Sequence, residues 1–132
     1  MRLAALPLLL VVASPALAAD QFDLACQGTR TAQRGGAAEP YSFRVHVDFA
    51  AQKWCEEACE TVQPMVSVDD DMLVFVDDAT LNTRLDLVRE VTFDRKTNSF
   101  VHHFSQFRPT DAYLSVKAQC TTEAFTPFPA GK

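Results

Sequence analysis

The chain has 132 residues, 48% of them hydrophobic, and a formal net charge of −5 at pH 7. This length fits one small domain with a single core. With 12 Lys and Arg against 17 Asp and Glu, the chain has little positive charge for binding nucleic acid or an anionic membrane surface, since both are bound mainly by cationic side chains. We expect neither kind of partner.

The first 19 residues are organised as a cleavable secretory signal. Arg2 supplies the positive charge, an apolar run follows over 3–12, and a small-x-small triplet at 16–18 offers a cleavage site. The apolar run is too short to span a bilayer, and it has no polar face that would suit a domain surface. We expect a signal peptide over 1–19, one mature domain over 20–132, no membrane insertion after cleavage, and a periplasmic or secreted protein.

Four cysteines remain in the mature chain: Cys26, Cys55, Cys59 and Cys120. In an oxidising compartment an even number indicates disulfides, and four cysteines allow three pairings. Cys55 and Cys59 are close together in a turn-like stretch, whereas Cys26 and Cys120 belong to the first and last predicted strands. We favour the pairs Cys55–Cys59 and Cys26–Cys120.

Alternation of apolar and polar residues dominates the mature chain. It is clearest over 41–49, which predicts a half-buried antiparallel strand. The stretch 30–40 contains Gly and Pro among small polar residues and predicts a loop. Pro64 predicts an edge or a bulge in its strand, and Arg89 interrupts an otherwise apolar face. In chain order, strands are expected over 22–26, 41–49, 61–68, 72–76, 83–93, 99–104 and 112–121, with turns at 69–71, 77–79 and 94–98.

This pattern gives about seven or eight short strands at roughly ten-residue spacing, without a convincing helix. We expect an all-β fold: an antiparallel meander closed or partly closed into a barrel, with a β-sandwich as the alternative. A bridge between Cys26 and Cys120 would place the first and last strands side by side, which favours the barrel.

The cysteines and histidines do not form a redox or zinc motif. Cys55 and Cys59 are one residue further apart than in a redox-active Cys-x-x-Cys motif, and the two glutamates between them disfavour a reactive thiolate. His102 and His103 are adjacent, so on a strand they face opposite sides and cannot easily share one metal ion. The cysteine spacing also lacks a second pair of zinc ligands.

Calcium and hydrolase motifs are missing as well. The acidic residues at 69–71 and 77–78 lack the Gly and the distal Glu of a calcium loop. No nucleophile elbow accompanies Ser105, His103 and Asp111. We therefore expect no enzyme, no cofactor and no metal site.

Aromatic residues are concentrated in the C-terminal third of the chain. Phe104, Phe107 and Phe128 form a candidate patch for a ligand or a partner. The alternative is that the phenylalanines fill the core and close one end of the barrel, as side chains do in small barrels. Phe107 and Phe128 lie in loop-like contexts, which favours their exposure.

Three motifs extend over most of the mature chain: Phe22-x-Leu24-x-Cys26-x-Gly28, Trp54-Cys55-x-x-x-Cys59, and Cys120 followed by Pro127-Phe128. Together they resemble a family of small exported proteobacterial proteins without an established activity. The motifs are structural, so this resemblance implies no substrate and no catalytic residue.

In size, compartment and long disulfide, the chain is also similar to the periplasmic inhibitors of c-type lysozyme, which are small disulfide-linked antiparallel barrels. The Ser-Gly-rich inhibitory loop of that family has no counterpart in this sequence. Two hypotheses follow. The first is an exported binding or interaction module without catalysis, for a small apolar ligand or another envelope protein. The second is an inhibitor of a secreted hydrolase such as lysozyme, which a protruding polar loop over 30–40 would favour.

The inhibitor hypothesis predicts that the mature protein slows the lysis of bacterial cell walls by c-type lysozyme. The measurement is the fall in turbidity of a cell-wall suspension with and without added protein. An unchanged lysis rate at micromolar excess over the lysozyme would contradict this hypothesis.

Overall fold

The computed structural model describes residues 20–131, and the expected signal peptide over 1–19 lies outside them. Strands are the only regular elements of this described range. Within it there is no helix long and apolar enough to cross a membrane. The nine strands are β1 (Gln21–Thr31), β2 (Glu39–Asp48), β3 (Lys53–Glu56), β4 (Gln63–Pro64), β5 (Ser67–Val68), β6 (Met72–Leu81), β7 (Asp86–Asp94), β8 (Ser99–Arg108) and β9 (Ala112–Glu123).

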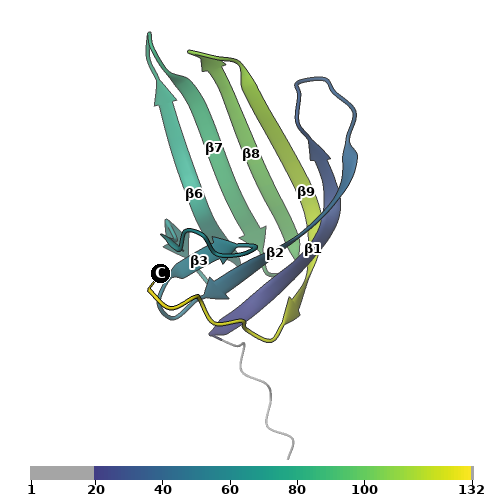
Figure 1. The fold of residues 1–132 in the computed structure, drawn as a ribbon, viewed down its shortest axis with the longest axis vertical. Coiled ribbons are helices and arrows are strands. Elements are labelled where there is room, and N and C mark those ends of the chain that lie inside the picture. Colours follow the sequence, from purple (N-terminus) through teal and green to yellow (C-terminus); the bar gives the residue numbers. More distant parts are fainter. Residues whose placement is uncertain (1–19, 132) are drawn as a thin grey trace, which may run out of the picture.

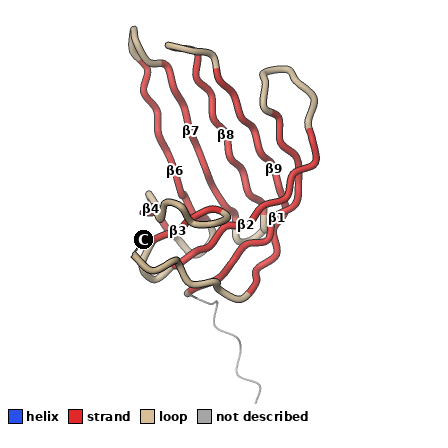
Figure 2. Tube along the Cα trace, in the orientation of Figure 1, coloured by secondary structure: helices blue, strands red, loops and turns tan. Residues whose placement is uncertain are grey.

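All nine strands belong to one antiparallel sheet in the order β4-β3-β2-β1-β9-β8-β7-β6-β5. The long strands β6 to β9 run side by side, and β1 and β2 cross in front of them, so the sheet curls into a half-barrel (Figures 1 and 2). The expected partly closed antiparallel barrel is therefore confirmed, and the two-sheet sandwich does not form.

The concave face of the half-barrel holds the core. Alternation puts Leu24 and Val45 on this face, and both are fully buried. Aromatic rings meet across the curl: Trp54 on β3 lies 4.8 Å from Phe75 on β6, and Phe43 on β2 lies 4.9 Å from Phe100 on β8, between ring centroids. These contacts join the two halves of the sheet at one end of the concavity.

The pairing of β1 with β9 places the first strand beside the last. Cys26 and Cys120 are partners in this register and form a disulfide with a Cα–Cα distance of 4.0 Å. Two residues further on, a Cβ at Gly28 would lie 2.0 Å from the carbonyl oxygen of Lys117, so only glycine fits there. The second disulfide joins Cys55 and Cys59, and both predicted pairings are confirmed.

Several predicted boundaries were wrong. The expected turn at 77–79 lies within β6, which continues to Leu81 because β7 pairs with it along this length. A bulge between Val74 and Val76 shifts the alternation of inward and outward side chains along β6. The expected strand over 61–68 is divided into β4 and β5, which lie at opposite edges of the sheet. Pro64 is on an edge strand, as predicted.

The two disulfides are expected to contribute unequally to stability because they close loops of different length. The sequence separations are 94 residues for Cys26–Cys120 and 4 residues for Cys55–Cys59. Replacing the first pair by alanines is expected to lower the free energy of unfolding by about 4–5 kcal/mol, and replacing the second pair by about 2 kcal/mol. Urea unfolding of the two double variants measures both changes in the free energy of unfolding. A larger loss of stability without the Cys55–Cys59 disulfide than without Cys26–Cys120 would contradict this prediction.

Candidate ligand-binding face

The concave face contains a cavity of ≈ 120 Å³ beside the aromatic core, which we call the central cavity. Both halves of the curled sheet contribute to it. From β1, β2 and β3 come Arg30, Tyr41, Phe43 and Glu56, and from β8 and β9 come Phe100, His102, Leu114 and Val116. Apolar side chains thus form most of the lining, and three ionisable side chains converge on it.

Strand register explains why these polar residues face inward. His102 is paired with Val91 and with Val116, both of which are buried in the core. Arg30 is the partner of Val116 across the β1–β9 pair, and Glu56 is the partner of the fully buried Val45. Directly paired side chains project from the same face of a sheet, so all three point into the concavity.

Arg30 is the cationic group of the central cavity. Its guanidinium carbon lies 4.7 Å from the centroid of the Tyr41 ring, and its Nη2 lies 3.7 Å from Glu39 at the rim. Its Nε atom is buried and has no hydrogen-bond acceptor among the described residues. A buried N–H without an acceptor is unfavourable, so this atom is a ready donor to a bound molecule.

Burial changes the ionisation of the other two polar residues. It lowers the pKa of His102 to about 4, with further lowering by the positive charges of Arg89 and His103. At neutral pH His102 is therefore uncharged. Glu56 keeps an exposed side chain, but partial desolvation of its carboxyl raises its pKa, an effect that Arg89 opposes and Glu57 adds to. The arginines keep their charge, because guanidinium does not titrate in proteins.

A second cavity of ≈ 320 Å³ adjoins the first at Glu56. It lies between the turn closed by the Cys55–Cys59 disulfide and β7, and its lining includes Arg89 together with Glu56, Glu57, Ala58, Glu60, Thr61 and Gln63. Arg89 and Phe104 are register partners, and Phe104 is in turn the partner of Leu114. The two cavities and these side chains form one continuous concave surface.

Three further hollows are lined mostly by residues of β1, β2, β8 and β9, with Glu57 of the disulfide-closed turn at one of them. Their linings include polar side chains such as Gln27, Gln119 and Lys117. Gln27 and Gln119 are exposed register partners that alternate with the inward-facing Cys26 and Cys120. These hollows therefore lie over the convex face, and they lack the inward-facing ionisable groups that the central cavity has.

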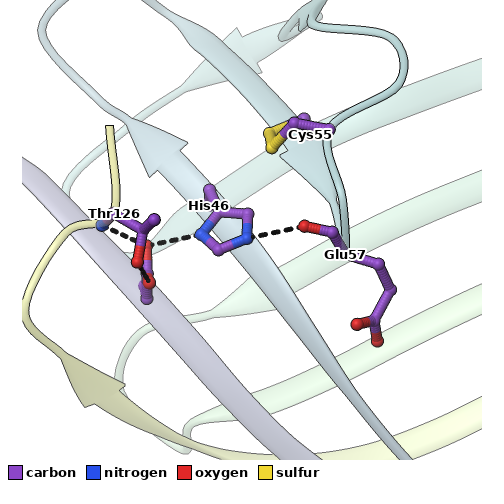
Figure 3. The surroundings of a disulfide bond; sticks show 6 residues. His46, Cys55, Glu57 and Thr126 are labelled. Carbon is purple, nitrogen blue, oxygen red and sulfur yellow. Dashed lines mark hydrogen bonds and ion pairs between the residues drawn. A yellow bond between two sulfur atoms is a disulfide. The ribbon is translucent and has the colours of Figure 1, made fainter. Parts of the chain in front are cut away.

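A buried polar cluster on the convex side fixes the turn that carries Glu56 (Figure 3). Each ring nitrogen of His46 faces an oxygen: Asp23 Oδ1 at 2.8 Å from Nδ1, and the Glu57 carbonyl at 2.9 Å from Nε2. His46 thereby connects β1 and β2 to the disulfide-closed turn.

The C-terminal tail completes this cluster. Thr126 donates to Asp23 from its backbone N–H at 3.0 Å and from its hydroxyl at 2.6 Å. Burial of Asp23 disfavours its charge, but the hydrogen bonds from Thr126 and His46 outweigh this effect and hold the pKa of the carboxyl below its ordinary value of 3.8. The buried carboxylate of Asp23 on β1 therefore connects the tail to β2, and through His46 to the disulfide-closed turn.

The structure does not gather Phe104, Phe107 and Phe128 into one patch. Phe104 lies on the concave face, in register with Arg89 and Leu114. Phe107 is 56% exposed and lies under the guanidinium of Arg34, near the end of β8. Phe128 belongs to the tail at the other end of the sheet, where it packs against Phe125. Phe107 and Phe128 are therefore separated by the length of β9, about ten residues or roughly 33 Å.

The loop between β1 and β2 is attached to the tip of the sheet through Arg34. Its side chain donates to Asp111 and to the Gln106 carbonyl, both at 3.2 Å, and its guanidinium lies 3.7 Å from the Phe107 ring centroid. The predicted 30–40 loop is shorter than expected, because β1 extends to Thr31 and β2 begins at Glu39.

The predicted separation of the two neighbouring histidines agrees with the structure. His102 faces the central cavity, whereas His103 lies 5.7 Å from Tyr113, between ring centroids, on the opposite face. Within residues 20–131, no group of three or more His, Cys, Asp or Glu side chains could hold a metal ion.

Sequence reasoning missed Arg30, Glu56 and His102 as site residues. Arg30 was assigned to a loop, and Glu56 was considered only as a neighbour of the disulfide. The sequence did contain a detectable signal. A charged residue stands at a strand position where alternation directs the side chain toward the core, and Arg89 is another example.

Comparison of the chain with protein-family models, curated proteins and solved structures yields no match. The two resemblances noted in the sequence stay predictions.

Thr126→Val tests the buried carboxylate of Asp23. Removing the hydroxyl donor is expected to lower the free energy of unfolding by about 1–2 kcal/mol at neutral pH. Because the native pKa of Asp23 lies below its unfolded value, its stabilising contribution is complete above about pH 4 and is lost as the pH falls through the native pKa. The difference between variant and wild type should therefore shrink in acid.

Urea unfolding at neutral pH and near pH 3 measures this difference. Thr121→Val is the matched control, since the Thr121 hydroxyl makes only an exposed contact at 3.5 Å with Ala25. The control should change stability by less than about 0.5 kcal/mol. A Thr126→Val effect that is equally large at both pH values would contradict the assigned role.

Proposed function

We propose that the protein is an exported, non-catalytic binding module that holds a small amphipathic molecule on its concave face. The observation that carries this proposal is the central cavity, where an apolar lining and the side chains of Arg30, Glu56 and His102 converge. Binding sites for small molecules typically combine a mostly apolar concave surface with a few converging polar groups.

The dimensions of the cavity favour a ligand that extends beyond it. At ≈ 120 Å³ it is smaller than the roughly 300–1,000 Å³ of pockets that enclose a drug-sized molecule. It suits one end of a ligand. Tyr41, Phe104 and Leu114 are partly exposed on the same face and offer apolar surface to the rest of the molecule.

We infer reversible binding because the central cavity is mostly apolar and offers a bound molecule the donor of Arg30. The expected signal peptide and the two disulfides support a periplasmic or secreted location, where disulfides persist. A carrier or sensor of a small amphipathic molecule fits that setting.

The proposal predicts that the mature protein binds the neutral fluorophore N-phenyl-1-naphthylamine with a rise in fluorescence and a blue shift. Leu114→Asp, on the concave face, should weaken binding about tenfold, because it removes apolar surface worth roughly 1.5–3 kcal/mol. Val88→Asp is the matched control: Val88 is 36% exposed and alternates with the inward-facing Arg89, so it points to the convex face.

Fluorescence titration measures the dissociation constants, and thermal melting shows whether both variants remain folded. Unchanged binding in the Val88→Asp control would support the concave site. Absence of probe binding to the wild type, or equal loss in the two variants, would contradict the proposal.

A further inference from the structure

We propose that the ligand is an anionic amphiphile whose carboxylate head group binds Arg30 in the central cavity. This inference rests on the proposed binding function and adds the chemical class of the ligand. It follows from the donor left unpaired in the cavity, the charges around it, and the apolar surface that leads away from it.

The unpaired donor specifies an acceptor on the ligand. Arg30 Nε is buried and has no acceptor among the described residues, while the remainder of the guanidinium lies over the Tyr41 ring and has a rim contact with Glu39 at 3.7 Å. The side chain of Glu39 is 68% exposed, so water competes strongly for that contact. A carboxylate would accept from Nε and a terminal nitrogen together, in the two-point geometry that guanidinium favours.

Arg30 is the cationic group that an anion would meet in the central cavity. At neutral pH His102 is uncharged, so Glu56 is the acid that faces Arg30 there, and partial desolvation disfavours its negative charge. Arg89, in the second cavity, is already surrounded by Glu56, Glu57 and Glu60. The preference for an anion therefore depends on the unpaired donor of Arg30 and not on a net positive charge of the concave face.

The size and position of the cavity favour a small head group with an apolar chain. The ≈ 120 Å³ volume suits a carboxylate and the first carbons attached to it, not a bulky sugar or nucleotide. From there Leu114, Phe104 and Leu87 lie on successive strands of the concave face and are only partly buried. An aliphatic chain placed along them would cover apolar surface that otherwise contacts water.

Displacement of the neutral fluorophore by three ten-carbon competitors tests this inference on the mature wild-type protein. Decanoate, decanol and decyltrimethylammonium share the chain and differ in head-group charge, and each is used below its micelle concentration. We expect decanoate to displace the probe at about tenfold lower concentration than decanol, and decyltrimethylammonium to be weakest.

Two variants assign the head group to Arg30. Arg30→Gln should abolish the advantage of decanoate over decanol, measured as the ratio of the two displacing concentrations within the same variant. Lys117→Gln is the matched control, since it removes one positive charge from the residue next to Val116 but on the convex face. It should leave the order of the competitors unchanged.

Each outcome bears on a different claim. Equal displacement by all three competitors would overturn the anionic head group and leave the binding function intact. An advantage for decanoate that persists in Arg30→Gln would overturn the assignment to Arg30. Failure of the fluorophore itself to bind would instead contradict the binding function. The wild-type comparison stands even if a variant is poorly folded.

Discussion

The pairing of β1 with β9 is the constraint on which the rest of the structure depends. It joins residues near the two ends of the described range 20–131, and the Cys26–Cys120 disulfide makes the junction covalent. The N-terminal strands extend the sheet on one side of this pair and the C-terminal strands on the other. The curl of the sheet then faces the two sides toward each other, so the central cavity is lined by both.

The incomplete closure of the barrel explains why the concave face is not filled throughout. β3 pairs only with the last four residues of β2, and β5 pairs only with Leu73 and Val74 at the start of β6. At this end Trp54, Phe75 and Phe100 pack into a continuous core. Beyond it β2 and β6 have no further strand paired on their outer sides within residues 20–131, and the inward positions include ionisable as well as apolar residues.

The buried pair of Asp23 and His46 and the cavity residue Arg30 have different roles. Asp23 and His46 are buried, and every short contact they make is with another part of the same chain. They are structural: they hold the tail and the disulfide-closed turn against β1 and β2. Arg30, by contrast, keeps a buried donor that has no acceptor among residues 20–131. The cluster of Asp23 and His46 holds the turn that positions Glu56 at the rim. The guanidinium of Arg30 is available to a ligand.

Much of the fold was predictable from local patterns, whereas the site was not. Alternation predicted the strands, and the first and last strands predicted the long disulfide. The extension of β6 through Asp77 and Asp78 was missed, because these residues favour turns and only pairing with β7 keeps them in a strand. Arg30, Glu56 and His102 come from three strands far apart in sequence, and only the curl of the sheet brings them together.

The central claim is that the concave face is where this protein binds its ligand. Amide NMR of the ¹⁵N-labelled protein, titrated with decanoate, tests it most directly. We expect the shifted signals to cluster at Arg30, Glu56, His102 and Leu114 and at their neighbours on the concave face. Shifts confined to the convex face, to Phe107 or to the tail around Phe128 would contradict it.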